Sequence, residues 1–215
     1  MTGPEIWNDI NVKLIAILRG IKPEETDEIV TGLLDAGFRA IEIPLNSPDP
    51  FTSIARAVEI AKGYGPCLIG AGTVLRSEDV AQIDSIGGNL IVSPNIDPEV
   101  VDASVARKMA SFPGLFTATE AHLAIKHGAT GLKFFPAGQL GPDGIKGIRA
   151  TLPDTTQVCA VGGVGPSGFA QYMAAGVVGF GLGSNLYKAG DDAATVIERG
   201  VECVAKYRAL LEPTT

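Results

Sequence analysis

The chain has 215 residues, of which 46% are hydrophobic and 19% are charged, and its net charge is −7. This acidic balance, without any cluster of lysines and arginines, argues against nucleic acid as a partner. No apolar stretch reaches the ~18 residues of a membrane span, and residues 1–9 lack the basic start and apolar core of a signal peptide, so we expect no membrane association.

The cysteines and histidines narrow the class of protein further. Cys67, Cys159 and Cys203 are odd in number and have no paired spacing, which predicts buried thiols in a reducing compartment and hence a cytoplasmic protein. His122 and His127 are five residues apart, so they do not share one helix face as a metal-binding pair would. We expect both on one helix, facing solvent, and no multi-histidine zinc site.

The first predicted elements are a strand, a helix and a second strand. The apolar run 14–18 predicts a strand. Pro23 and the acids that follow it predict a helix start, because proline suits the first helical position and acids suit the positive end of the helix dipole. Gly37 is expected to end this helix in the left-handed conformation, and residues 40–43 to form the next strand.

The same succession of glycine and strand recurs after Gly88, Gly128 and Gly176. The strand-like segments beyond the second are residues 67–70, 90–93, 115–118, 130–133, 157–161 and 177–181. They alternate with helical segments, which predicts βαβ units and a parallel sheet.

About eight strands in one chain of this length favour a single-domain α/β fold over residues 1–215. We predict a (β/α)8 TIM barrel with a short N-terminal helix, and a doubly wound open sheet is the alternative. The fifth residue after each glycine is expected at the C-terminal end of its strand, where barrels hold their chemistry. These residues are Glu42, Ser93, Lys133 and Gly181.

Lys133 is the most informative of them, because it lies within the apolar run 131–136. A buried lysine commonly pairs with a carboxylate or extends its ammonium to the surface. The alternative is a reactive amine. Desolvation lowers a lysine pKa from ~10.4 by up to ~3–5 units, and a neutral amine attacks carbonyl groups to form a Schiff base.

Glu42 and two glycine-rich segments are the next candidates. An acid at a strand end can serve as a general base, although a carboxylate that pairs with an arginine or caps a helix is the more common case. Residues 161–165 and 181–185 follow the last two predicted strands. Barrels frequently bind phosphate there through backbone N–H groups, so phosphate binding is favoured over simple tight turns.

Three further observations concern other strand ends. Arg19 closes the first strand and Thr73 the third, and an arginine with a hydroxyl group can hold a substrate carboxylate. Either could also be an ordinary rim residue. Residues 179–183 contain three glycines but fail the spacing of a dinucleotide fingerprint, so a dinucleotide is not expected.

Together these features resemble the 2-keto-3-deoxy-6-phosphogluconate aldolase family over most of the chain. The motifs are Glu42-Ile43-Pro44-Leu45, Gly70-Ala71-Gly72-Thr73-Val74, Ser93-Pro94, Lys133-Phe134-Phe135-Pro136-Ala137 and Gly162-Gly163-Val164. The resemblance implies a (β/α)8 barrel, a homotrimer and class I aldol chemistry with no cofactor and no metal. The implied small molecules are a phosphorylated 2-keto-3-deoxy sugar acid, pyruvate and glyceraldehyde 3-phosphate.

The resemblance also implies roles for individual residues. Lys133 would be the Schiff-base lysine and Glu42 the acid/base. Arg19 and Thr73 would meet the pyruvoyl carboxylate, and Phe135 would form a wall of its pocket. The implied substrate-binding set is completed by Pro94, Gly162, Gly163, Gly183 and Ser184, of which Gly162, Gly163 and Ser184 would meet the phosphate.

Two positions bear on the substrate. The gluconate enzyme has arginine where this chain has Asn46, and threonine where it has Val161. In both respects the chain looks like the sister enzyme, 2-keto-3-deoxy-6-phosphogalactonate aldolase, whose substrate differs at the C4 hydroxyl. The gluconate enzyme and 4-hydroxy-2-oxoglutarate aldolase stay as alternatives, as do a phosphate-binding isomerase and a non-catalytic sugar-phosphate-binding protein.

Overall fold

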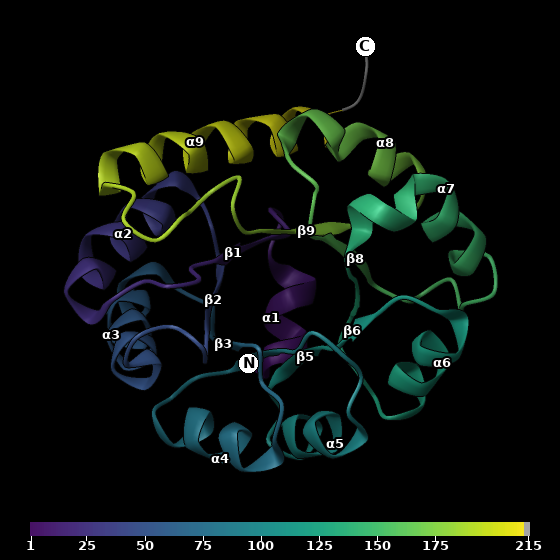
Figure 1. Cartoon of the computed structure of the whole chain (residues 1–215), viewed down its shortest axis with the longest axis horizontal. Helices are drawn as coiled ribbons and strands as arrows, with labels where there is room; N and C mark the ends of the chain where they lie inside the picture. Colours follow the sequence, from purple (N-terminus) through teal and green to yellow (C-terminus); the bar gives the residue numbers. More distant parts are fainter. Residues whose placement is uncertain (213–215) are drawn as a thin grey trace.

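The computed structural model describes residues 1–212, in which a parallel sheet curls into a nearly closed barrel surrounded by helices (Figure 1). The strands are β1 (Leu14–Ile17), β2 (Ala40–Pro44), β3 (Leu68–Gly72), β4 (Leu90–Val92), β5 (Ala110–Phe112), β6 (Gly114–Leu115), β7 (Leu132–Phe134), β8 (Val158–Val161) and β9 (Gly179–Leu182). The helices are α1 (Gly3–Asp9), α2 (Pro23–Ala36), α3 (Pro50–Ala61), α4 (Ser77–Ser85), α5 (Pro98–Ala106), α6 (Ala118–Lys126), α7 (Ala137–Arg149), α8 (Phe169–Ala174) and α9 (Ala193–Ala209), with 3-10 turns η1 (Lys62–Tyr64) and η2 (Pro166–Gly168).

The strand order confirms the barrel and excludes the doubly wound sheet. Neighbouring strands are parallel in the order β5-β4-β3-β2-β1-β9-β8-β7-β6, so the first strand pairs with the last. The two edges of the sheet, β5 and β6, are separated in the chain only by Pro113, which lacks the N–H that a ladder needs. They therefore share the fifth of eight positions around the barrel. The predicted N-terminal helix is α1.

The fifth strand lies earlier than predicted. The sequence pattern placed it at residues 115–118, whereas the paired residues are 110–112 and 114–115, and Ala118 already begins α6. The preceding helix α5 ends at Ala106, and the left-handed residue that follows it is Lys108 (φ 58°), not a glycine. The pattern of glycine followed by strand therefore missed this join. Similarly, the left-handed residue before β4 is Gly87 (φ 84°) and not Gly88.

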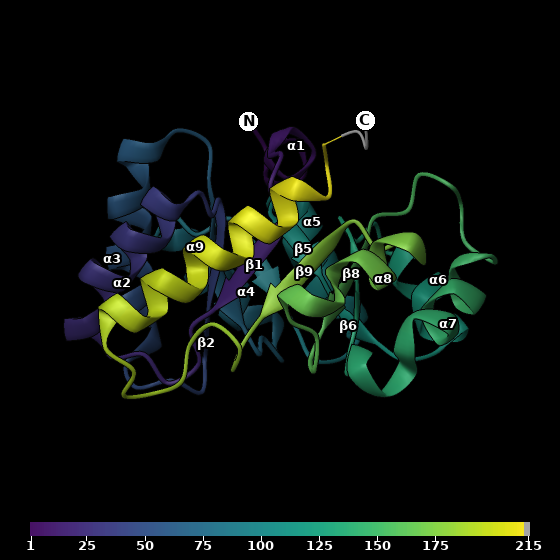
Figure 2. The same cartoon turned by 90° about the horizontal axis from the view of Figure 1, so that it is seen from above.

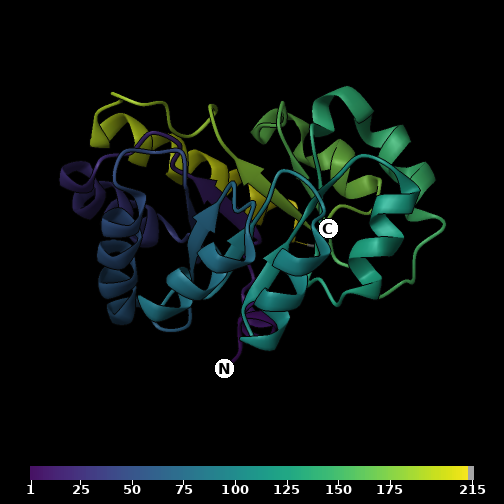
Figure 3. The same cartoon turned by 60° about the horizontal axis from the view of Figure 1, so that its bottom comes forward.

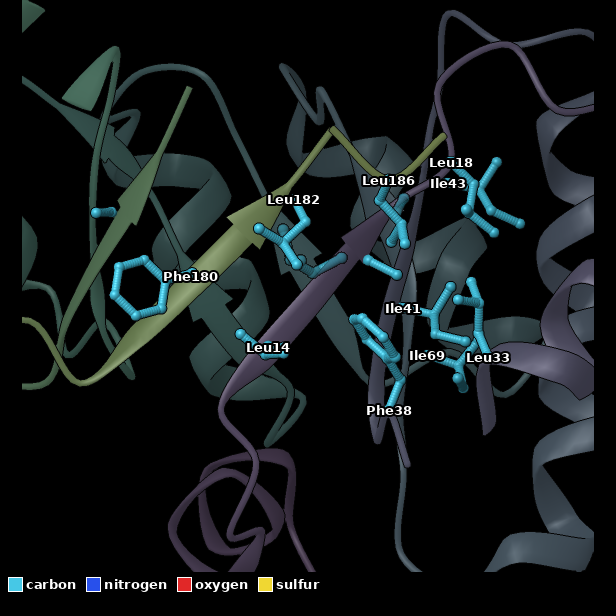
Figure 4. Packing of buried hydrophobic residues seen from close by; sticks show 14 of the residues in the cluster. Leu14, Leu18, Leu33, Phe38, Ile41, Ile43, Ile69, Phe180, Leu182 and Leu186 are labelled. Atoms are coloured by element: carbon cyan, nitrogen blue, oxygen red, sulfur yellow. The ribbon is translucent and has the colours of Figure 1, made fainter. Parts of the chain in front are cut away.

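Apolar side chains on the outer face of the barrel pack against the surrounding helices. Ile41 and Ile43 of β2 and Leu33 of α2 are fully buried in one apolar cluster, and Figure 4 shows Ile41 near Leu33. The same cluster includes Leu132 and Phe134 of β7. Because side chains alternate across a strand, the residues between these pairs, Glu42 and Lys133, point into the barrel.

A second cluster fills the barrel beneath those two residues. Ile6, Trp7 and Ile10, from α1 and its C-cap, pack with inward-facing strand residues such as Leu68 and Leu90. The Trp7 ring meets Phe112 edge-on at 4.7 Å between centroids. Figures 2 and 3 show α1 at one end of the barrel and the strand tips pointing to the other. The interior is therefore packed shut at its N-terminal end.

Candidate active site

Lys133 and Glu42 lie within their strands, not at the strand ends as predicted. Lys133 is the middle residue of β7 and Glu42 the middle residue of β2. Because they lie within the strands and not at the rim, both side chains are buried: only 7% of Lys133 and 2% of Glu42 are exposed. Of the four residues predicted at strand ends, Ser93 follows β4 directly and Gly181 lies within β9.

The Lys133 amine is held by a backbone carbonyl and an aromatic face. Its Nζ donates to the Ser93 oxygen at 3.1 Å and lies 4.9 Å from the centroid of the Phe135 ring. Burial lowers the pKa of Lys133 to about 8; Arg19 adds to this effect and Glu42 opposes it. With a pKa of about 8, roughly one amine in ten is neutral at pH 7, against about one in 3,000 for an ordinary lysine.

Glu42 is a buried acid without a charge partner in contact. Its Oε2 has no hydrogen-bond partner, and among residues 1–212 no ion pair joins it to Lys133. Burial raises the pKa of Glu42 to about 7, against the opposing influence of Lys133 and Arg19. A carboxyl group with this pKa exchanges a proton readily at neutral pH, as a general acid/base must.

Arg19 connects three strand ends. Its Nη1 donates to Oδ1 of Asn46 at 2.5 Å, and its Nη2 donates to Oγ1 of Thr73 at 3.3 Å. Thr73 adopts a left-handed backbone (φ 55°), which is costly for a β-branched residue and is typical of functional sites. The two bonds fix the guanidinium plane at the C-terminal face of the barrel.

A cavity of about 180 Å³ opens beside Arg19 and Phe135 and continues to the glycine-rich loops. It is lined by Ile17, Arg19, Phe135, Val161, Gly162, Gly163, Val164, Gly181, Gly183, Ser184 and Asn185. Gly162 and Gly163 are both left-handed (φ 86° and 76°), and a side chain at Gly162 would meet the Phe135 ring. These loops suit an anion that approaches the backbone closely.

The chain matches a known protein family over most of its length. The model described as KDPG and KHG aldolase matches residues 9–199. The chain belongs to the KDPG and KHG aldolase family. The resemblance noted in the sequence is thereby confirmed.

Individual relatives of this aldolase cover nearly its whole length. It is 53% identical over 197 residues to a Rhizobium meliloti protein named "Probable 2-dehydro-3-deoxy-6-phosphogalactonate aldolase", covering 92% of each chain. It is 47% identical over 196 residues to an Escherichia coli protein named "2-dehydro-3-deoxy-6-phosphogalactonate aldolase", covering 91% of this chain and 94% of the relative. A solved structure described as "Native KDPGal structure" superposes with a TM-score of 0.90 at 45% identity, covering 94% of this chain and 97% of that one.

The predicted site residues fall into two connected groups in this aldolase. Glu42 and Lys133 lie in the barrel interior with Asn46 and Thr73 at its C-terminal face, whereas Val161, Gly162, Gly163, Gly183 and Ser184 line the cavity. Arg19 and Phe135 belong to both groups, because each lines the cavity and contacts a residue of the first. Pro94 does not line the cavity. Its carbonyl group lies against Gly114, and the preceding residue, Ser93, accepts the hydrogen bond from Lys133.

The sequence-based prediction missed Ile17, which forms an apolar wall with Val161 and Gly181. Asn185, which lies in the predicted segment 181–185, donates to the Val164 carbonyl at 2.9 Å. Ile17 is one of several isoleucines in an apolar strand, and only its register beside Glu42 identifies it. Within residues 1–212 no group of three or more acids, cysteines and histidines has the geometry to hold a metal ion. None of the helices there is long and apolar enough to cross a bilayer.

Proposed function

We propose that this protein is a class I aldolase that cleaves 2-dehydro-3-deoxy-6-phosphogalactonate (2-keto-3-deoxy-6-phosphogalactonate) to pyruvate and D-glyceraldehyde 3-phosphate. The observation that carries the proposal is the pairing of a buried amine with a buried acid, Lys133 and Glu42, on facing parts of one barrel interior. The substrate follows the names of the two relatives at 53% and 47% identity.

The proposed reaction begins when neutral Lys133 attacks the C2 ketone. Loss of water gives a protonated imine, which accepts the electron pair of the breaking bond. Glu42 removes the C4 hydroxyl proton, directly or through a water, and the C3–C4 bond breaks to release glyceraldehyde 3-phosphate. The enamine left on Lys133 takes up a proton, and hydrolysis of the resulting imine consumes one water, which balances the water lost at the start, and gives pyruvate and free Lys133.

The other site residues are proposed to bind the two ends of the substrate. Arg19 and Thr73 would hold the carboxylate beside the reacting carbon, with Phe135 as the wall of this pocket and Pro94 beside it. The loops with Gly162, Gly163, Gly183 and Ser184 would hold the phosphate. Because the phosphate is remote from the breaking bond, its binding energy can position the substrate for reaction.

Selectivity between the C4 epimers is proposed to involve Asn46 and Val161. The apolar wall of Ile17, Val161 and Gly181 offers no hydrogen bond to a hydroxyl group, and such walls discriminate weakly. We expect cleavage of the galactonate epimer, and Val161→Thr is expected to raise kcat/KM for the gluconate epimer relative to it. A strong preference of the unaltered protein for the gluconate epimer would overturn the substrate assignment.

The central experiment is reduction with borohydride in the presence of pyruvate. A stable mass adduct on Lys133 is expected, and it should be absent from Lys133→Ala, which should fold but not turn over. Lys13 is an internal control, because burial also lowers its pKa while its Nζ is bonded to backbone carbonyls beside α1. An unmodified protein, or an adduct on Lys13 instead, would contradict the Schiff base. Activity should survive EDTA.

Assembly and location complete the proposal. We propose a homotrimer, as the resemblance implies, which light scattering of the purified protein would test; a monomeric mass would contradict it. We also propose a cytoplasmic location, in keeping with three cysteines that are all buried and free. Cell fractionation would test it.

A further inference from the structure

Gly72, the last residue of β3, has the Glu42 carboxyl group lying directly against its backbone. The three atoms nearest to the position where a Cβ would stand are Oε2, Cδ and Oε1 of Glu42, all well inside van der Waals contact. In the strand register Glu42 pairs with Gly70, and Gly72 is two residues further along, on the same face. The carboxyl group therefore occupies the space that a side chain at position 72 would need.

The reason for a glycine here is space and not backbone conformation. Gly72 is absent from the residues with positive φ, so its backbone is one that any residue adopts. Gly70 differs, because a side chain there would meet the backbone of Leu90 in the neighbouring strand. At Gly72 the three nearest atoms all belong to the flexible end of the Glu42 side chain, so a methyl group at this position requires Glu42 to move.

The consequence concerns the separation of acid and amine. Glu42 and Lys133 are opposite charges in one buried interior, yet no ion pair joins them. The contact with Gly72 keeps the carboxyl group against β3, and the Lys133 amine, which extends from β7, donates to the Ser93 carbonyl at the end of β4 instead of to Glu42. Arg19 is the third charge that acts on both groups.

We propose that Gly72 is a positioning residue: because it has no side chain, it leaves space for the Glu42 carboxyl group against β3 and so keeps this group from pairing with Lys133. The proposal builds on the assignment of Glu42 and Lys133 as acid/base and nucleophile. A side chain at position 72 pushes the carboxyl group off the β3 wall into the barrel interior, where Lys133 is the buried cation. The resulting ion pair holds the amine in its charged, unreactive form.

The test is Gly72→Ala, with turnover and amine reactivity measured together. The expected result is a kcat at least ~100-fold lower, in the range of a lost acid/base, with KM changed less than about threefold. Competitive labelling with acetic anhydride should give an apparent pKa of Lys133 at least one unit higher than in the unaltered protein. Gly147→Ala is the matched control, because a side chain there meets no atom within 4 Å, and both readouts should stay unchanged.

A double-mutant cycle with Glu42→Ala, measured by Tm, shows whether the effect of Gly72→Ala arises from the Glu42 side chain or from a general destabilisation of the fold. Gly72→Ala should lower Tm when Glu42 is present and should be neutral or stabilising in the Glu42→Ala background. Equal losses of Tm in the two backgrounds, an unchanged kcat, or failure of the double variant to fold would overturn the proposal. If the unaltered protein has no aldolase activity, the proposed function fails. The labelling and the double-mutant cycle still test whether Gly72 positions the Glu42 carboxyl group.

Discussion

Glu42→Gln is expected to change how the stability of the protein depends on pH, apart from its effect on turnover. In the folded chain the pKa of Glu42 is about 7, against 4.5 for an ordinary glutamate. Between these values the folded state keeps a proton that the unfolded state loses, so the free energy of unfolding falls as pH rises from 4.5 to 7. The shift of about 2.5 units corresponds to a loss of about 3 kcal/mol.

Glutamine has no proton to lose, so the variant avoids this loss. The free energy of unfolding of Glu42→Gln minus that of the unaltered protein should therefore increase by up to about 3 kcal/mol between pH 4.5 and pH 8. Removal of the Glu42 charge also lowers the pKa of Lys133, which changes the difference in the same direction. Urea denaturation at several pH values measures this difference, and a value that stays constant across the range would refute the reasoning.

Three further predictions concern the amine and the Arg19 network. Formation of the pyruvate adduct on Lys133 should rise about tenfold per pH unit below pH 8 and level off above it, because the neutral amine reacts; a flat profile by mass spectrometry would contradict this. Asn46→Ala removes one of the two side-chain partners of Arg19. It should raise KM about tenfold, the equivalent of about 1.4 kcal/mol, and change kcat much less. Steady-state kinetics that show an unchanged KM would mean that Asn46 does not orient Arg19. Thr73→Gly relieves the left-handed strain and should stabilise the fold by about 1 kcal/mol while it weakens substrate binding, so a lower Tm in thermal unfolding would count against strain at this residue.

The barrel was predictable because the joins between its helices and strands carry clear local signals. Gly37 and Gly176 take left-handed backbones at helix ends, as the sequence indicates. The one misplaced strand follows Lys108, which adopts the same conformation without being glycine. Backbone strain of this kind depends on tertiary contacts, so local sequence cannot reveal it.

The site was predictable as a set of residues but not as a geometry. Lys133 is conspicuous because a charge interrupts an apolar run. The contact of Glu42 with Gly72 depends on strand register, which no local pattern encodes, and Gly72 appears in the sequence only as part of a glycine-rich motif. The bond between Asn46 and Arg19 joins residues from different strand ends, so it emerges only when the barrel closes.

Helix α1 closes one end of the barrel and thereby determines how substrate and products reach and leave the proposed site. Ile6, Trp7 and Ile10 close the N-terminal end of the barrel, so substrate enters and products leave through the one mouth at the opposite end. In the proposed reaction the phosphorylated aldehyde is free to leave once its bond to the enamine is broken, whereas pyruvate stays attached to Lys133 until hydrolysis. The proposed covalent bond would therefore make pyruvate the last product to leave, through the same opening by which the next substrate molecule enters.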